Sequence, residues 1–190
     1  MEYNPYAPPT AVVDAPSTDR AGSPVFFPVS TLKLVVMSLC TLGLYEVYWF
    51  YMNWRFVKLR DRSDIWPLPR AIFGFFFCFA MFDRMRRDGN ARSLGNPPPM
   101  GPLTALWIVV TLCWKLPDPY WLVSYLAVAA LVPVQIYVNR INATDAPGHE
   151  VNRRFSALNW LGIVGGGLIL ILSIVGTLLS NTGIAGVPAH

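Results

Sequence analysis

The chain has 190 residues, enough for one domain or two small ones. Hydrophobic residues make up 54% and charged residues only 14%, whereas about a quarter of a typical soluble domain is charged. The apolar residues come in long runs, and so few charged residues cannot coat a soluble surface. The sequence therefore excludes an ordinary soluble protein and predicts an all-α integral membrane protein, with a net charge of +4.

The first 30 residues contain six prolines and few apolar residues before Val25. This composition predicts a disordered tail over residues 1–30, because such a segment has too little apolar surface to build a core. A multi-spanning helical membrane domain is then expected over residues 31–182.

The first expected span covers residues 33–54, and its 22 mainly apolar positions suffice to cross about 30 Å of hydrocarbon. Five Tyr and Trp residues lie in its second half, which predicts an aromatic belt at the membrane–water interface. They are Tyr45, Tyr48, Trp49, Tyr51 and Trp54.

Residues 71–82 form a second apolar run, rich in phenylalanine and bounded by Arg70 and Asp83. As a helix these positions would extend only about 18 Å, less than the thickness of the hydrocarbon core. We therefore expect a short re-entrant or interfacial helix here.

Three further spans are expected over residues 102–117, 120–139 and 158–179. Pro117-Asp118-Pro119 predicts a tight turn between the first two, since neither proline continues a helix. Pro133 predicts a kink in the second. The sequence thus predicts four transmembrane helices.

Twelve of the fifteen basic residues lie within 55–102 and 140–157. Because Lys and Arg concentrate in cytoplasmic loops, these segments are expected inside and both termini outside. The lipid bilayer is the expected partner, with anionic headgroups at the cytoplasmic face. The membrane explains the basic residues, so no nucleic acid is expected.

Three polar residues lie within the predicted spans and form a candidate intramembrane site: Glu46, Asn53 and Gln135. Glu46 and Gln135 are expected at similar depth, where a neutral Glu46 could donate to the Gln135 carbonyl. Charges in hydrocarbon cost roughly 2.5–3.5 kcal/mol on insertion scales, so such residues are candidates for a proton or ion path. The other interpretation is structural, with these residues holding helices together.

The last span carries small residues near one face: Gly162, Gly166, Ser173, Gly176 and Ser180. The Gly162-x-x-x-Gly166 spacing lets two helix backbones approach closely. This candidate packing face serves either contacts within the chain or a homo- or hetero-oligomer.

No pattern of catalytic or metal-binding residues emerges. Cys40, Cys78 and Cys113 lie in separate apolar runs, and His149 follows Pro147-Gly148 in a turn. Metal sites and cofactors are therefore not expected, and neither is an enzymatic activity.

The stretch Thr41-Leu-Gly-Leu-Tyr45-Glu-Val-Tyr48-Trp49-Phe-Tyr51 resembles a Thr-x-Gly-x-Tyr-x-x-Tyr-Trp-x-Tyr pattern found in a family of small uncharacterised bacterial membrane proteins. The family pattern usually has an apolar or small residue where this chain has Glu46. The resemblance implies a bacterial inner membrane and supplies no activity.

These observations favour a non-enzymatic interaction or regulatory component of a membrane assembly. The alternative is a small transporter or channel subunit with a polar path near Glu46 and Gln135. Access of water to Glu46 distinguishes the two hypotheses, because a packing residue is dry.

Overall fold

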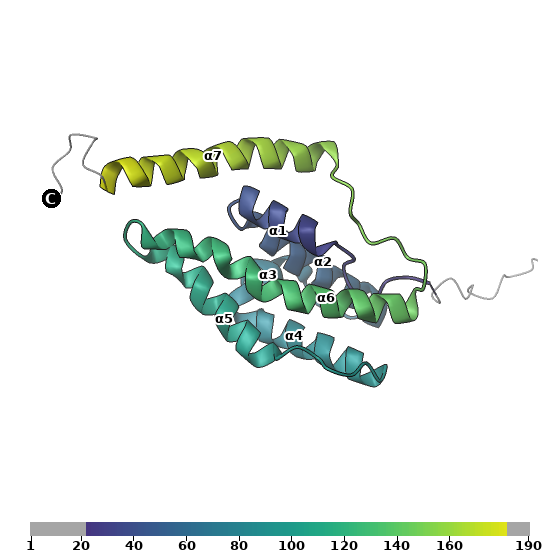
Figure 1. Ribbon diagram of the computed structural model, residues 1–190. Coiled ribbons are helices and arrows are strands. Elements are labelled where there is room, and N and C mark those ends of the chain that lie inside the picture. Colours follow the sequence, from purple (N-terminus) through teal and green to yellow (C-terminus); the bar gives the residue numbers. More distant parts are fainter. Residues whose placement is uncertain (1–21, 182–190) are drawn as a thin grey trace, which may run out of the picture.

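The computed structural model describes residues 22–181, and its regular elements are helices, which confirms the all-α class for this part of the chain (Figure 1). In chain order the elements are α1 (Thr31–Cys40), α2 (Leu44–Asp61), α3 (Pro67–Ile72), α4 (Gly74–Ala91), α5 (Met100–Leu112), η1 (Cys113–Lys115), η2 (Tyr120–Ala127), α6 (Val128–Asp145) and α7 (Ala157–Asn181).

A sharp turn at residues 41–43 divides the first expected span into α1 and α2, so the prediction of one continuous helix over 33–54 is wrong. Leu42 and Gly43 have positive φ angles of 56° and 83°, a backbone conformation that interrupts a right-handed helix and suits glycine. The Thr41 hydroxyl accepts a hydrogen bond from the backbone N–H of Tyr45 (3.0 Å), one of the N–H groups in the first turn of α2 that have no partner within the helix.

Beyond this turn the chain reverses direction, so α1 and α2 form a hairpin. The backbone N–H of Phe27, which precedes α1, donates to Oδ1 of Asn53 in α2 (3.2 Å). The Phe27 ring also lies 5.7 Å from that of Tyr48. With ten residues, α1 is only about 15 Å long, half of what a perpendicular crossing needs.

A second hairpin is formed by α3 and α4. Pro67 begins α3, where a missing N–H costs nothing, so this proline starts a helix. The helix expected over 71–82 is divided at Phe73: Ala71 and Ile72 end α3, and residues 74–82 form the first half of α4. The charged residues of α4, which continues to Ala91, are paired. Arg84 pairs with Asp61, and Arg60 Nη2 lies 2.8 Å from Asp88 Oδ2, so the C-terminal ends of α2 and α4 meet.

The third hairpin has two arms. In the first arm α5 continues into η1, and in the second arm η2 continues into α6. The Pro117–Pro119 turn lies where the sequence predicts it, and Pro133 lies inside α6. The helix runs to Asp145, six positions beyond the predicted end at 139, because Ile141 and Asn142 are buried and extend its contact with the core.

Two stretches among the described residues are long and apolar enough to cross a membrane, Tyr120–Asp145 and Ala157–Ser180. The other apolar helices, Thr31–Cys40 and Met100–Lys115, are shorter. Four full-length spans are therefore not supported.

The segment before α1 belongs to the core. Residues 25–29 contact both α2 and α6, and Phe26 and Val29 have no exposed surface. The expected tail over 1–30 is therefore wrong from Val25 onward, while residues 1–21 lie outside the described residues. Proline-rich composition hid this segment because its apolar residues are few but all buried.

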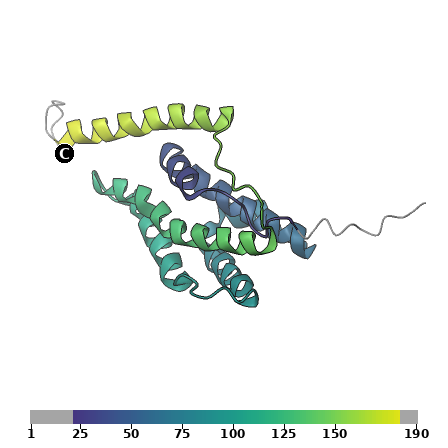
Figure 2. The same ribbon diagram turned by 45° about the vertical axis from the view of Figure 1, so that its right-hand side comes forward.

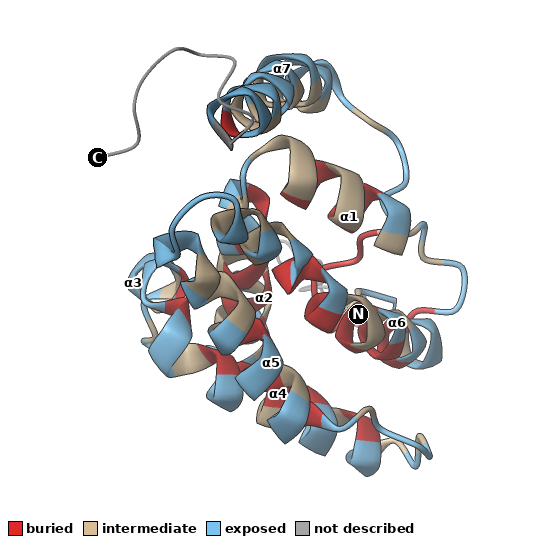
Figure 3. Cartoon of the chain, turned by 60° about the vertical axis from the view of Figure 1, so that its left-hand side comes forward, coloured by how far each residue is buried: buried red, intermediate tan, exposed pale blue. Residues whose placement is uncertain are grey.

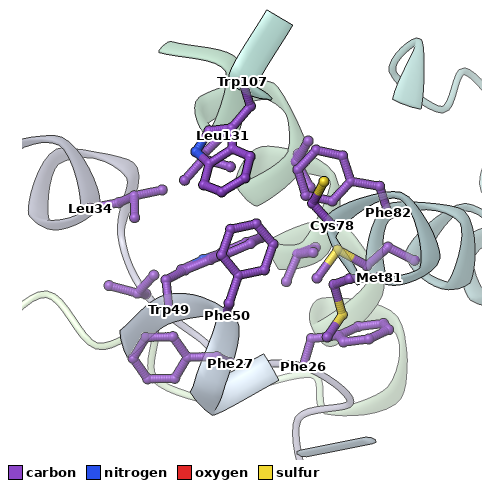
Figure 4. Close-up of a cluster of buried hydrophobic side chains, with 14 of the residues drawn as sticks. Phe26, Phe27, Leu34, Trp49, Phe50, Cys78, Met81, Phe82, Trp107 and Leu131 are labelled. Atoms are coloured by element: carbon purple, nitrogen blue, oxygen red, sulfur yellow. The ribbon is translucent and has the colours of Figure 1, made fainter. Parts of the chain in front are cut away.

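Aromatic residues from α2, α4 and α5 fill the core (Figure 4). The Phe50 ring packs between those of Trp49 (5.0 Å) and Trp107 (4.9 Å), measured between centroids. Tyr45, Trp49 and Trp54 are buried, so these members of the expected aromatic belt are core residues instead. Burial is concentrated in the faces that α1, α2, α4 and α6 turn inward, whereas α7 is mostly exposed (Figure 3).

Gly89 of α4 allows close contact with α6. A Cβ at this position would overlap the ring of Tyr137, which is almost fully buried. We expect Gly89→Ala to destabilise the protein by about 1–3 kcal/mol, the usual cost of overpacking. Thermal unfolding in detergent measures this, and Gly95→Ala is the control because no atom lies within 4 Å of its added Cβ. If Gly89→Ala and Gly95→Ala unfold at the same temperature, the close contact between Gly89 and Tyr137 is contradicted.

Candidate functional site

The three polar residues predicted as one site lie in two separate places. Asn53 and Gln135 both bind the backbone of Phe27, through its N–H (3.2 Å) and its carbonyl (3.2 Å). Glu46 instead accepts a hydrogen bond from Trp107. The expected bond from Glu46 to Gln135 is absent, because Gln135 Oε1 accepts from Trp49 Nε1 (2.6 Å).

Gln135 belongs to a row of amide side chains on α6 that holds the segment before α1. Its Nε2 donates to Phe27 O (3.2 Å) and to Asn139 Oδ1 (2.9 Å), and Asn139 Nδ2 donates to Val29 O (3.1 Å). Asn142 completes the row by binding the backbone of Val25 and Phe26. Buried amides with this many partners stabilise a unique arrangement of the chain.

Glu46 lies in the first turn of α2 and is 6% exposed. Its Oε2 accepts from the indole Nε1 of Trp107 in α5 (2.7 Å). The N-terminus of a helix favours a negative charge, so the position within α2 supports a carboxylate there. The hydrogen bond joins the first hairpin to the third.

A partly open cavity of about 460 Å³ lies beside Glu46. Residues at the tips of all three hairpins line it: Leu42 and Gly43, Ile72 and Gly74, and Trp114 and Trp121. Gln135 and Asn53 do not line it. The structure thus connects Glu46 with a cavity and the other two residues with packing.

An ion-paired end lies away from the hairpin tips, where α2, α4 and α6 end. Arg84 and Arg60 pair with Asp61, and Arg92 binds Asp145 through two nitrogens (2.7 and 2.5 Å). At the same end the Arg86 guanidinium, hydrogen-bonded to Asp83, lowers the pKa of that carboxyl. Much of the basic charge in 55–70 and 83–93 is therefore paired within the chain.

The small-residue face of α7 divides into two halves. Gly162 and Gly166 pack on the C-terminal end of α1, and a Cβ on Gly166 would overlap the carbonyl oxygen of Cys40. Figures 1 and 2 both show α7 lying along α1. Ser173 is half-buried, whereas Gly176 has no atom within 4 Å of an added Cβ and Ser180 is exposed. The first half makes a contact within the chain, whereas the second half has open space at Gly176 beside a buried Thr177.

Substitutions of Glu46 separate the hydrogen bond from the charge. Gln keeps an oxygen that can accept from Trp107, so Glu46→Gln should retain nearly full stability. Leu removes the acceptor and leaves a buried indole N–H unpaired, so Glu46→Leu should cost about 1–3 kcal/mol. The free energies of unfolding in detergent compare the two, and a Gln variant as unstable as the Leu variant would exclude this role for the bond.

Sequence reasoning missed Trp107, Asn139 and Asn142 as partners of the polar residues. One signal was available, since Gln135, Asn139 and Asn142 follow the i, i+4, i+7 spacing of one helical face. The predicted end of the helix at 139 hid this row.

Within residues 22–181, no group of three His, Cys, Asp or Glu side chains is arranged to hold a metal ion. No family model matches the chain, and no curated protein or solved structure is significantly similar to it. The resemblance of residues 41–51 to a bacterial membrane-protein family therefore stays a prediction. In this chain, Thr41 and Gly43 of that pattern form the turn between α1 and α2.

Proposed function

We propose that this chain is a non-enzymatic component of a membrane assembly, embedded in a bacterial inner membrane. The observation that carries the proposal is α7, a 25-residue apolar helix whose large side chains are mostly exposed. Such a helix is long enough to cross the hydrocarbon core, and in water it would be an aggregation site.

The ion pairs favour one side of the membrane for three segments. Arg84 with Asp61, and Arg92 with Asp145, join the ends of α2, α4 and α6. Charged groups of this density belong in water or among headgroups, and their basic character favours the cytoplasmic side. The exposed basic residues at this end would meet anionic lipid headgroups: Arg55, Arg62, Arg87, Arg140, Arg153 and Arg154.

The first hairpin supports a topology different from four spans. Arg60 lies 5.3 Å from the ring centroid of Phe26, so the chain enters α1 from the ion-paired end and α2 returns to it. In the proposed arrangement α1–α2 and α3–α4 are re-entrant hairpins. The crossing segments are α5 with η1, η2 with α6, and α7.

Exposed aromatic residues on α3 and α4 fit this arrangement. Trp66, Phe73, Phe76 and Phe79 are more than half exposed on the outer side of the second hairpin. Contact with lipid would cover these apolar rings on the outer side of the hairpin. The open position at Gly176 on α7 is the proposed contact with a partner chain, because a small residue there lets another backbone approach.

Labelling of single cysteines with a membrane-impermeant thiol reagent tests the topology. In a cysteine-free background, cysteines at Ser23, Ser63 and Asn90 should react from the same side of sealed membranes, and a cysteine at Ser180 from the other. Reaction of the Ser23 and Ser63 positions from opposite sides would restore a crossing by residues 33–54.

A photoreactive amino acid at Leu172, which is 62% exposed, tests the role in an assembly. Cross-linking in intact cells should give a discrete protein adduct, whereas the same group at Gly162, which packs on α1, should give none. If Leu172 gives lipid adducts alone, the assembly role fails while the membrane topology stands.

A transporter or channel subunit is the second candidate function. The cavity beside Glu46 favours it, although Gln135 is outside that cavity and has its polar atoms paired. A continuous polar path through both residues therefore has no support, and what remains of this alternative is binding at Glu46.

A further inference from the structure

We propose that the cavity beside Glu46 binds an organic cation, an ammonium group that carries apolar substituents. This binding site is additional to the assembly role and does not rest on it. The cavity volume of about 460 Å³ falls within the range of small-molecule sites.

The charge of the cavity points to a cation. Glu46 contributes the carboxylate, and none of the described residues that line the cavity is Lys or Arg. Trp107 satisfies one carboxylate oxygen, Oε2, and leaves Oε1 for another partner. A buried carboxylate without a positive partner is costly, and a bound cation would supply that charge.

The walls of the cavity suit an ammonium group rather than a metal ion. Six aromatic side chains line it: Phe50, Phe75, Trp107, Trp114, Trp121 and Tyr125. Aromatic faces attract organic cations through the ring quadrupole, and cages of such rings are the common way to recognise quaternary ammonium groups. Metal ions would need several oxygen ligands in place of these rings.

An unpaired hydroxyl adds a second polar contact. Ser38 of α1 is among the lining residues and is 2% exposed, yet its Oγ has no hydrogen-bond partner in the described part of the chain. Buried hydroxyls are normally paired, so an orphaned one beside a cavity suggests a ligand that supplies the partner. The N–H of a primary, secondary or tertiary ammonium group can donate to it, whereas a quaternary ammonium group has no N–H and would bind through the carboxylate and the rings alone.

The position of the cavity also fits its ligand. Its walls come from the tips of the three hairpins, and the arginines of the ion-paired end lie at the opposite ends of α2, α4 and α6. Repulsion from those guanidinium groups is thereby kept small. The same ammonium chemistry occurs in free amines and in the ethanolamine headgroup of a phospholipid.

Calorimetric titration of the full chain in nanodiscs tests the proposal, with benzyltrimethylammonium as the probe. Discs of phosphatidylglycerol should show saturable binding, and neopentylbenzene, the neutral isostere, should bind about tenfold more weakly or worse. Glu46→Gln should lose affinity by a similar factor, while Glu150→Gln, which removes an exposed carboxylate outside the cavity, should not.

A second set of discs distinguishes the two sources of the cation. If phosphatidylethanolamine in the disc weakens binding of the probe in the wild type, the lipid headgroup occupies the cavity. If the lipid has no effect, a free amine is the ligand. Equal binding of the neutral isostere, or unchanged affinity in Glu46→Gln, would overturn the proposal. The isostere comparison uses the wild-type chain, so it holds even if the variant fails to fold.

Discussion

Replacing Gly166 with leucine is expected to separate α7 from α1. The obstacle is the carbonyl oxygen of Cys40, a backbone atom at the end of α1 that cannot rotate away as a side chain would. Overpacking usually costs 1–3 kcal/mol, and contact with backbone places this variant at or above about 3 kcal/mol. The helix itself should persist, because its apolar residues remain suited to the membrane.

Gly165→Leu is the matched control for this experiment. It adds the same side chain one position earlier, where no atom lies within 4 Å of an added Cβ. Thermal unfolding in detergent should therefore show a lower midpoint for Gly166→Leu alone. If both variants unfold like the wild type, the contact between α7 and α1 does not contribute to stability.

Replacing Asn142 with leucine is expected to release the segment before α1 from the core. Asn142 Oδ1 accepts from the backbone N–H groups of Val25 (2.9 Å) and Phe26 (3.0 Å), and Nδ2 donates to Phe26 O (3.0 Å). Each buried group left unpaired costs about 1–3 kcal/mol, so the variant should lose at least about 3 kcal/mol. Limited proteolysis should then cleave near residue 25.

Thr144→Val serves as the control, since Thr144 lies on the exposed side of α6 and bonds only within its own helix. It should retain the protease resistance of the wild type. Resistance in Asn142→Leu as well would mean that apolar burial of Phe26 and Val29 is sufficient to hold the segment.

The helices that the sequence predicts best are those with uninterrupted apolar runs and clear turn residues. The turn at Pro117–Pro119 and the helix from Ala157 follow directly from such patterns. The contact of Gly162 with α1 follows the Gly-x-x-x-Gly spacing, although spacing alone left its partner open.

The turn at Thr41–Gly43 escaped prediction because its neighbours on both sides are apolar. Hydropathy measures how favourably a residue transfers into hydrocarbon and contains no information on backbone angles. In this turn Gly43 is the residue whose type indicates a positive φ angle. Pro67 shows that a proline is no sure sign of a helix end, since it stops a helix from within but is favoured at its first turn.

The expected bond between Glu46 and Gln135 failed for a geometric reason. Similar depth presupposes one straight helix over 33–54, whereas Glu46 lies beside the turn at the tip of a hairpin. Gln135 lies deeper in the core, opposite Trp49. A change of direction after Thr41 therefore moves Glu46 toward the tips, where Trp107 is its neighbour.

The buried segment 25–29 also sets an order for biosynthesis. Its hydrogen-bond partners on α6 lie more than 100 positions further along the chain, as the separation of 116 between Phe26 and Asn142 illustrates. Proteins are made from the N-terminus, so the ribosome has synthesised most of the chain before Asn142 is available to this segment. Until then Phe26 and Val29 have no finished core to enter. Residues 25–29 are thus synthesised long before they reach their final place, and they join the first hairpin to the third.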